Sequence, residues 1–545
     1  MAATRIELYD TTLRDGTQSE DIAFSVTDKL RVAAKLDELG IDFIEGGFPG
    51  SNPRDHEFFQ RARGELKLGH ARLVAFGATR RAGVRADDDP GLRALLEAGT
   101  ETVTIFGKSW QRHAEMVLGV SDAEALEIVH TSVAFLAARA GAVVFDAEHY
   151  FDGYRLTPEF ALAALRAAAQ GGARFVVLCD TNGGGLPGQI ADATRAACEV
   201  LGPGITLGVH CHNDGELAVA NSLAGVGAGA RHVQGTINGY GERCGNANLV
   251  SVAPNLMLKL GYDCLVEGAL PRLSEVAHFV AEVANRTPDS HQPFVGGSAF
   301  AHKGGVHVAA VARAPDTYEH IAPELVGNHR RVLVSDLSGR ANILYKAREY
   351  GLSLDEGDPA ARARARGILE QLKELEARGY QFEGAEASFE LLVRRGLGTA
   401  PRWFDLLSFR SLSESAQGQP YALSEATVRI AVGDRRAHTV AEAHGPVNAL
   451  DGALRKALEP FYPTLAGVRL NDYKVRVLPS GAGTASMVRV LCESGDGSSA
   501  WGTVGVSESI IEASCKALLD AAEYKLMKDG IAPPDWGPAG AAPTG

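Results

Sequence analysis

IELYDTTLRDGTQSEDIAFSVTDKLRVAAKLDELGIDFIEGGF, residues 6–48, contains two short β-type runs separated by a longer amphipathic stretch. The two runs are IELYDT (6–11) and FIEGGF (43–48), and apolar residues recur at helical spacing in VTDKLRVAAKLDELG (26–40) between them. This order predicts a strand, a helix and a second strand, which is the repeating unit of α/β folds.

Local signals also mark the two ends of the predicted helix. Ser25 is a suitable N-cap with Asp28 three residues later, and Gly40 follows the last apolar position, as a C-cap glycine should. The helix is therefore expected to begin after Ser25 and to end before Gly40.

The same alternation of β-type runs and helical stretches continues to about residue 260. Six further runs follow the first two: RLVAFGA (72–78), TVTIF (102–106), VVFDAEHY (143–150), FVVLCDT (175–181), TLGVHCH (206–212) and HVQGTI (232–237). Eight strands that are each followed by a helix predict a closed TIM (β/α)8 barrel rather than an open doubly wound sheet. Periodicity alone leaves the open sheet as an alternative.

Polar residues occur at the ends of seven of the eight predicted strands. They are Asp10 to Asp15, Glu45, Lys108, Glu148, Asp180 with Thr181, His210 with His212, and Asn238. Because the carboxyl ends of the strands form the active face of a TIM barrel, these residues predict an active site there.

Three further regions follow the barrel, which we assign to residues 1–270. Residues 271–410 are predicted to form helical linker subdomains that contribute to the active site. Residues 411–535 combine β-type alternation with two long helices, so a separate α+β domain is expected there. The tail, residues 536–545, is predicted to be disordered.

Composition limits the classes of function. The 545 residues are 45% hydrophobic and 22% charged, which is typical of a globular protein, and the net charge of −13 argues against nucleic acid as a partner. No run of about 18 apolar residues occurs, so no membrane helix is expected. The seven cysteines form no CxxC pair, which predicts reduced thiols and a cytoplasmic protein.

HCHND (210–214) is the strongest single indication of a metal site. On a strand, His210 and His212 project from the same side, as a pair of metal-binding imidazoles would. The alternative is a pair of hydrogen-bonded histidines at a strand end. Asp15 offers a carboxylate to complete the site, and Asn246 in GYGERCGNANL (239–249) offers a neutral oxygen.

Two other polar residues suggest acid–base or oxyanion chemistry. Arg14 offers a guanidinium to an oxygen on which negative charge develops. Glu148 offers a carboxylate for proton transfer. For each residue the alternative is a structural salt bridge. The glycines of residues 239–249 have the spacing GxGxxxG, so a turn is favoured over a dinucleotide site.

The chain resembles the 2-isopropylmalate, homocitrate and citramalate synthase family over nearly its whole length. The motifs that carry the resemblance are DTTLRDGTQ, LCDTNGG, HCHND, GYGERCGN and FAHKGGVH, together with AEAHGPVNALDGALRKAL, LNDYKVRVL and WGTVGVSESIIEAS near the C-terminus. Members of this family are TIM-barrel enzymes with a divalent metal and a regulatory, dimer-forming last domain. EGGFPGSNPRD (45–55) and DGTQSEDIAFS (15–25) are more similar to the citramalate synthase branch.

The resemblance implies a role for each matching residue. It implies metal ligation by Asp15, His210, His212 and, more weakly, Asn246; substrate binding by Arg14, Gln18 and Thr181; and catalysis by Arg14, Glu148, His307 and Tyr318. His302 lies in a matching segment, and both a functional and a structural role remain open for it. Two histidines and one aspartate suit Mn²⁺, Mg²⁺ or Zn²⁺, and completion by substrate oxygens favours Mn²⁺ or Mg²⁺.

The resemblance further implies condensation of acetyl-CoA with a 2-oxo acid, for which pyruvate is the first choice. A homodimer is implied, as is inhibition by isoleucine at the last domain. The same chemistry on another 2-oxo acid, yielding 2-isopropylmalate or homocitrate, is an alternative. A lyase similar to hydroxymethylglutaryl-CoA lyase is a further alternative, and the full regulatory domain argues against it. A non-catalytic binding protein is disfavoured because every motif residue of a working site is present.

Overall fold

The computed structural model describes residues 4–311, 313–333, 340–352, 359–382, 384–414, 423–478 and 486–536. The chain forms two compact units. The first, called the barrel unit, contains residues 1–300 and 321–330. The second unit contains residues 301–320 and 331–545. Apart from Trp536, the tail that was predicted to be disordered lies outside the described residues.

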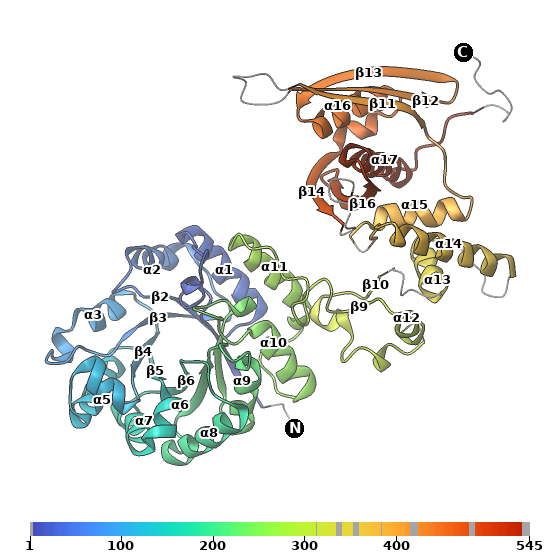
Figure 1. The fold of residues 1–545 in the computed structure, drawn as a ribbon. Coiled ribbons are helices and arrows are strands. Elements are labelled where there is room, and N and C mark those ends of the chain that lie inside the picture. The colour runs from blue at the N-terminus through green and yellow to red at the C-terminus, as the bar shows by residue number, and fades with distance from the viewer. Residues whose placement is uncertain are drawn as a thin grey trace. The chain divides into compact units, whose positions relative to one another are not determined.

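Eight parallel strands close into a barrel in chain order, and β1 pairs with β8 (Figure 1). The strands are β1 Glu7–Asp10, β2 Phe43–Gly47, β3 Arg72–Ala78, β4 Thr102–Lys108, β5 Ala142–Glu148, β6 Phe175–Asp180, β7 Thr206–Cys211 and β8 His232–Gly235. The predicted TIM barrel is confirmed, and the alternative of an open sheet is wrong.

The first crossover helix follows its sequence signals closely. Helix α1 spans Val26–Leu39, and the side chain of Ser25 accepts from the backbone N–H of Asp28, which closes a capping box. Gly40 has φ 86°, a left-handed conformation that glycine adopts at little cost. The buried positions of α1 face the barrel.

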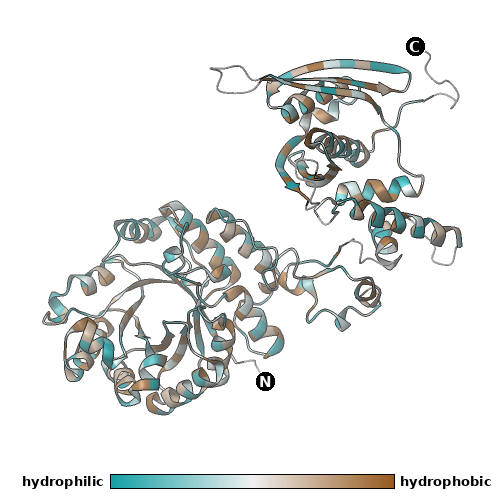
Figure 2. Ribbon diagram, in the orientation of Figure 1, coloured by the Kyte–Doolittle hydropathy of each residue, from teal (hydrophilic) through white to brown (hydrophobic). Residues whose placement is uncertain are grey.

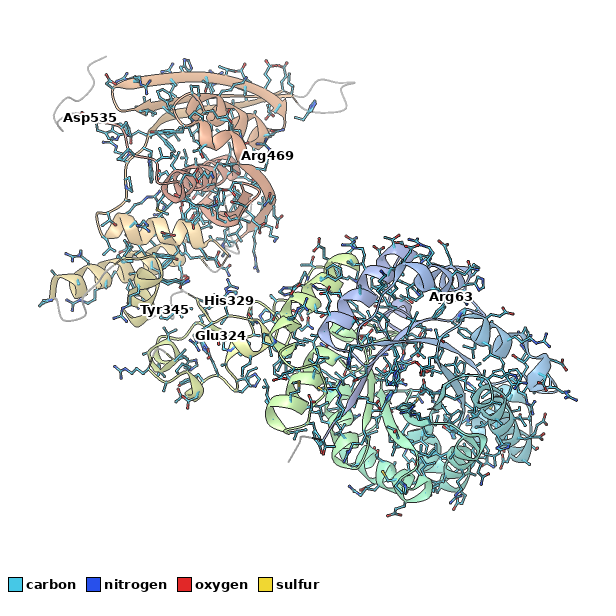
Figure 3. The ribbon with its side chains drawn as sticks, turned by 180° about the vertical axis from the view of Figure 1, so that it is seen from behind. Arg63, Glu324, His329, Tyr345, Arg469 and Asp535 are labelled. Carbon is cyan, nitrogen blue, oxygen red and sulfur yellow. The ribbon has the colours of Figure 1, made fainter. Side chains whose placement is uncertain are left out.

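Further helices cover the outside of the barrel (Figure 1). They are α2 Pro53–Glu65, α3 Pro90–Glu97, α5 Asp122–Ala137, α7 Pro158–Gly171, α8 Pro187–Leu201, α9 Ala218–Gly227 and α10 Leu249–Pro254, with the short α4 Gln111–His113 and α6 Tyr150–Leu156 at the strand ends. Helix α11, Leu273–Val283, follows the barrel and packs against α1. Figure 3 shows Arg63 of α2 on the outer side of this layer.

Hydrophobic side chains fill the barrel and the layer between strands and helices. Figure 2 shows the strands as mostly hydrophobic, whereas the helices alternate between hydrophobic and hydrophilic residues. The inner core contains Tyr9, Phe43, Val74, Val144, Phe175, Val177 and Cys179, all buried. Full burial of one large apolar side chain contributes about 1.5–3 kcal/mol, so this layer is a substantial part of the barrel's stability.

The second unit begins with helical elements and ends in two similar three-stranded sheets. Its first part has the strand pair β9 Ala301–His302 and β10 Arg331–Val332, with α12 Gly305–Val311, α13 Arg340–Glu349, α14 Pro359–Ala377 and α15 Glu386–Gly396. Two antiparallel sheets follow, each with one helix: β11 Asp405–Glu414, β12 Leu423–Val432, β13 Arg435–His444 and α16 Pro446–Leu458, then β14 Arg469–Val477, β15 Val488–Gly495, β16 Ala500–Ser507 and α17 Ile510–Lys528. The predicted helical linker and α+β domain are both present. None of the described helices has the length and apolar character that crossing a membrane requires.

His232 is an unusual member of the barrel interior. Its side chain is fully buried, and its ring lies 5.3 Å from the ring of Tyr9, 5.6 Å from that of Phe43 and 5.2 Å from that of Phe175. Neither ring nitrogen has a hydrogen-bond partner among the described residues. Burial lowers the pKa of His232 to about 3, so the ring is neutral in the folded protein.

Replacing His232 should therefore stabilise the barrel, most of all in acid. The unfolded chain binds a proton at His232 below its ordinary pKa of 6.5, and the folded chain does not until about pH 3. Wild-type stability thus falls by up to about 1.4 kcal/mol per pH unit below pH 6.5 from this residue alone. We expect His232→Leu to raise the melting temperature of the metal-free protein at pH 7.5, and to raise it further at pH 5. The control is His278→Gln, an exposed histidine of α11. If the melting temperature falls by the same amount between pH 7.5 and pH 5 in wild type and in His232→Leu, the prediction is wrong.

Candidate active site and metal centre

The C-terminal ends of the barrel strands surround a cavity of about 290 Å³. Seven of the predicted site residues line it together with seven that were not predicted. The lining residues are Arg14, Asp15, Gln18, Phe48, Phe76, Phe106, Asp146, Glu148, Cys179, Thr181, His210, His212, Glu242 and Arg243.

Asp15, His210 and His212 form a compact group of potential metal ligands at this cavity. Their ligand atoms lie within 4.8 Å of one another, and all three side chains are buried. The Nε2 atoms of His210 and His212 are 3.2 Å apart, and Nε2 of His210 is 3.4 Å from Oδ2 of Asp15. Strand alternation explains the histidine pair, because His210 lies in β7, His212 directly follows that strand in a bridge to Asn246, and residues i and i+2 of extended backbone face the same side. In the part of the chain that the structure describes, this is the single group of its kind.

Asn246 lies directly beside this group. Its Nδ2 donates to Oδ2 of Asp15 at 2.8 Å, and its backbone forms a β-bridge with His212. Its Oδ1 is buried and has no hydrogen-bond partner within the described residues. Leaving a buried acceptor unpaired costs about 1–3 kcal/mol. One carboxylate, two imidazoles and this amide oxygen fit a divalent cation.

The charges of the group are strongly coupled. Burial alone would raise the pKa of Asp15, but the Arg14 guanidinium and His210 outweigh burial and hold that pKa well below its usual range. Burial and the neighbouring His210 lower the pKa of His212 to about 3. Asp15 is therefore ionised and His212 neutral near pH 7, which are the forms that bind a metal.

Arg14 is held in place by contacts on several sides. Its Nε donates to Oε1 of Glu45 at 2.5 Å, and its Nη1 lies 3.5 Å from Oδ1 of Asp15. The guanidinium carbon lies 3.7 Å from the centre of the Phe76 ring. Burial opposes the charge of Arg14, but Asp15 and Glu45 raise its pKa further, so the group is a permanent cation. A fixed cation at the cavity suits an oxygen on which negative charge develops.

Glu148 and Thr181 occupy neighbouring strand ends. Glu148 ends β5, lines the cavity and pairs with Lys108 of β4, so the salt bridge weighed as the alternative to proton transfer is present, at the cavity. The hydroxyl oxygen of Thr181 accepts from the backbone N–H of His149 at 2.9 Å. Because this bond uses the oxygen as an acceptor, the hydroxyl hydrogen can be donated to a ligand.

Sequence analysis did not identify the apolar wall of the cavity. The rings of Phe76 and Phe106 stack with their centres 5.5 Å apart, and Phe48 meets Phe76 edge-on at 5.7 Å. Nothing in the sequence separates these residues from ordinary core aromatics, because strands are rich in aromatic side chains.

Arg243 was also missed, although it lies in a motif that was singled out. It donates to Oδ1 and Oδ2 of Asp214 at 2.7 and 2.9 Å, and to the backbone oxygen of Thr181 at 2.8 Å. This clamp ties the loop that contains Asn246 to the ends of β6 and β7. A bidentate arginine needs a carboxylate partner, and the sequence does not show that Asp214 is that partner.

His307 and Tyr318 belong to the second unit, where their ring centres lie 4.5 Å apart. His302 is in the same unit, and its Nε2 lies 3.0 Å from Oε1 of Glu319. Glu319 is buried. His302 thus has a structural partner that joins β9 to the turn before residue 321, while catalytic roles for His307 and Tyr318 stay predictions.

Asp15→Asn should weaken metal binding without unfolding the barrel. The substitution keeps the size of the side chain and removes the charge that offsets a divalent cation. We expect Mn²⁺ to bind at least about tenfold more weakly, as measured by isothermal titration calorimetry on metal-free protein. The matched control is Asp10→Asn at the end of β1, whose carboxylate accepts from Thr12. Unchanged Mn²⁺ affinity in Asp15→Asn would contradict the assignment of this ligand.

Three family descriptions match successive parts of the chain. Residues 5–280 match the HMGL-like family, residues 294–378 match the homocitrate synthase post-HMGL domain-like family, and residues 383–526 match the LeuA allosteric (dimerisation) domain. The first match covers the barrel and the metal-ligand group, and the third covers the two sheets with their helices.

Whole-length relatives narrow the family. The chain is 55% identical to the (R)-citramalate synthase of Geobacter sulfurreducens over 524 residues, which are 96% of this chain and 98% of that protein. It is 43% identical to the (R)-citramalate synthase of Sulfolobus acidocaldarius over 97% of this chain and 98% of that protein. Its identity to the 2-isopropylmalate synthase of the same organism is 36%, over 70% of this chain and 94% of that protein. The chain therefore belongs to the 2-isopropylmalate, homocitrate and citramalate synthase family, in the branch of the (R)-citramalate synthases.

Proposed function

We propose that this protein condenses acetyl-CoA with pyruvate and hydrolyses the thioester, so that one water is consumed and (R)-citramalate and CoA are released. Support comes from (R)-citramalate synthases that are 43–55% identical over nearly the whole chain. The observation that carries the proposal is the convergence of a metal-ligand group, Arg14 and Glu148 on one cavity. We assign the reaction to the cytoplasm and to isoleucine biosynthesis.

Asp15, His210 and His212 would hold the cation, with Asn246 as a weaker fourth ligand. A bound divalent ion, with Mn²⁺ or Mg²⁺ favoured over Zn²⁺, would supply Lewis-acid polarisation of the keto group of pyruvate. Arg14 stabilises the negative charge that develops on the keto oxygen, because Glu45 and Phe76 already orient its guanidinium.

Two other residues would orient pyruvate. Thr181 donates its free hydroxyl hydrogen to the pyruvate carboxylate, since its oxygen is already used by the N–H of His149. Gln18, which also lines the cavity, offers a second polar contact from the loop after β1.

Proton transfer requires at least one base, because the acetyl methyl group must lose a proton before it attacks the keto carbon. We assign this step to Glu148, with His307 and its ring neighbour Tyr318 as the second proton-transfer pair.

The apolar wall supports pyruvate as the 2-oxo acid. Phe48, Phe76 and Phe106 place three aromatic rings at the cavity, and this apolar wall suits the methyl group of pyruvate. Each methylene of difference between substrates is worth about 1–3 kcal/mol in such a pocket. We therefore expect 2-oxobutyrate to be used poorly and 2-oxoisovalerate hardly at all.

The direct test measures CoA release with a thiol reagent, using Mn²⁺-loaded enzyme, acetyl-CoA and one of four acceptors. We expect pyruvate to have at least about tenfold higher kcat/KM than 2-oxobutyrate, 2-oxoisovalerate or 2-oxoglutarate. Citramalate should accumulate in a one-to-one ratio with CoA. Preference for 2-oxoisovalerate or 2-oxoglutarate would replace the proposal with 2-isopropylmalate or homocitrate synthesis. Absence of CoA release with all four would overturn the synthase assignment.

A homodimer formed through the second unit is part of the proposal. The two sheets expose large apolar side chains that a second copy would cover. They are Leu407 and Leu412 of β11, Leu423 of β12, Val440 of β13 and Leu470, Val475 and Val477 of β14, each at least 40% exposed. Many exposed large apolar side chains are typical of an interface, and the matching family is described as a dimerisation domain.

We also propose that isoleucine binds in the second unit and inhibits the enzyme. A small cavity of about 40 Å³ lies between α16 and α17. It is lined mainly by aliphatic residues, including Leu454, Leu458 and Leu518. Asp451 and Arg455 also line it, and their side chains pair at 2.7 Å. Aliphatic walls beside one acid and one base suit an aliphatic amino acid, which carries both charges. The cavity holds only part of such a ligand, so binding requires the two helices to separate slightly.

Filling this cavity should weaken inhibition. Ala522→Leu adds an aliphatic side chain at a half-buried position of the lining. We expect the isoleucine concentration for half-inhibition of CoA release to rise at least about tenfold, compared within each variant to its own uninhibited rate. The control is Ile510→Ala, an exposed residue at the start of the same helix. If isoleucine inhibits Ala522→Leu at the same concentration as it inhibits wild type, the effector does not bind in this cavity.

A further inference from the structure

A buried chain of three polar side chains runs from the barrel interior to the proposed metal centre. Nε2 of Gln234 donates to Oδ1 of Asp146 at 3.0 Å, and Oε1 of Gln234 lies 2.9 Å from Nδ1 of His210. Gln234 is fully buried, and Asp146 and His210 are 4% and 6% exposed. Neither Gln234 nor Asp146 is among the proposed ligands.

Strand register explains why these residues meet. Gln234 of β8 is the direct partner of His210 in the pairing of β7 with β8. Asp146 of β5 reaches Gln234 through the barrel interior rather than along a ladder, because β5 pairs with β4 and β6.

Hydrogen-bond chemistry gives this chain a direction. A carboxylate only accepts hydrogen bonds, so Asp146 selects the NH₂ end of the Gln234 amide. The amide oxygen then faces Nδ1 of His210, and that nitrogen must carry the hydrogen. In the neutral form of His210, Nε2 is then the unprotonated nitrogen, on the side where Asp15 and His212 lie at 3.4 and 3.2 Å.

We infer that Asp146 and Gln234 are positioning residues that fix the tautomer and ring orientation of His210 for metal binding. The inference rests on the metal centre of the proposed function and adds two residues to it. Partners of this kind typically change metal affinity 10- to 100-fold when removed. Each of the two has a separate task, since Asp146 orients the amide and the amide orients the imidazole.

A second set of buried contacts in the same layer provides a matched control. The hydroxyl of Tyr9 donates to Oε2 of Glu45 at 2.6 Å and lies 2.8 Å from Oγ1 of Thr104. Glu45 in turn accepts from Arg14, so this set of contacts ends at Arg14 and not at a proposed metal ligand. Thr104→Val removes a fully buried hydroxyl at the same depth without touching the chain to His210.

The test measures Mn²⁺ affinity of the metal-free full chain by isothermal titration calorimetry at pH 8. Burial, assisted by Glu45, raises the pKa of Asp146 to about 7, so its carboxylate is ionised at this pH. Gln234→Met keeps the length of the side chain but offers Nδ1 of His210 no comparable acceptor, and it should bind Mn²⁺ about 10- to 100-fold more weakly. Thr104→Val should bind as wild type does.

A paired exchange separates orientation from packing. Asp146→Asn combined with Gln234→Glu swaps the amide and the carboxylate, so that the new amide donates to the new carboxylate and the carboxylate accepts from Nδ1 of His210. This double variant should regain affinity to within about threefold of wild type, whereas Gln234→Glu alone, which has the same shape but sets two carboxyl groups against each other, should stay weak; a packing role predicts equal affinity for both. The visible spectrum of the Co²⁺-loaded protein, which reports ligand geometry, should be altered in Gln234→Met and restored in the double variant.

The outcomes distinguish this inference from the function it rests on. Wild-type Mn²⁺ affinity in Gln234→Met would overturn the inference, as would a double variant as weak as Gln234→Met. Failure of the wild-type chain to bind Mn²⁺ would overturn the metal centre together with the inference. If the variants behave as expected but pyruvate yields no CoA, the positioning roles stand and only the proposed reaction fails.

Discussion

Pairing of β1 with β8 is the interaction on which the rest of this protein depends. The register sets Tyr9 opposite Gln234 and Asp10 opposite Gly235, and the N–H of Thr11 continues the contact by donating to the Gly235 oxygen at 2.8 Å. Closure brings the loop after the first strand beside the end of the seventh. Asp15 can share a ligand group with His210 only because the barrel is closed. In an open sheet, the first and seventh strands would lie far apart.

Closure also creates an interior in which polar side chains must find partners. Glu45 is bound by Tyr9 and Arg14, and Asp146, which lines the cavity, is bound by Gln234. An apolar layer would stabilise the barrel more simply, because buried charges carry a desolvation cost. In exchange, the network holds the groups of the site in one geometry before substrate arrives, which is the condition for effective electrostatic stabilisation. His232 lies deeper in the barrel and has no comparable partner among the described residues. Its burial therefore lowers the stability of the fold without holding any group of the site in place.

Specificity and chemistry are coupled in the same cavity. Phe76 contributes to the apolar wall and also lies under the Arg14 guanidinium at 3.7 Å. A change of Phe76 that enlarged the pocket would therefore also remove one contact of the Arg14 guanidinium, to which the proposed reaction assigns the developing charge. This shared residue gives a physical reason why a wider acceptor range in this scaffold should come with slower turnover, whereas Phe106, which contacts Phe76, is the less costly position to vary.

The strands and helices of the barrel, the caps at Ser25 and Gly40, and the metal-ligand group were all predicted from the amino-acid sequence. Those features depend on spacing over a few residues or on motifs that resemble a known family, and both can be recognised in the amino-acid sequence. The wall of Phe48, Phe76 and Phe106, the Arg243 clamp and the partnership of Gln234 with Asp146 could not be found in this way. Each of their members looks like an ordinary core or loop residue, and what distinguishes them is which side chain lies opposite. That neighbour is set by strand register and barrel closure, which bring together residues from distant parts of the chain, so only the tertiary structure decided it.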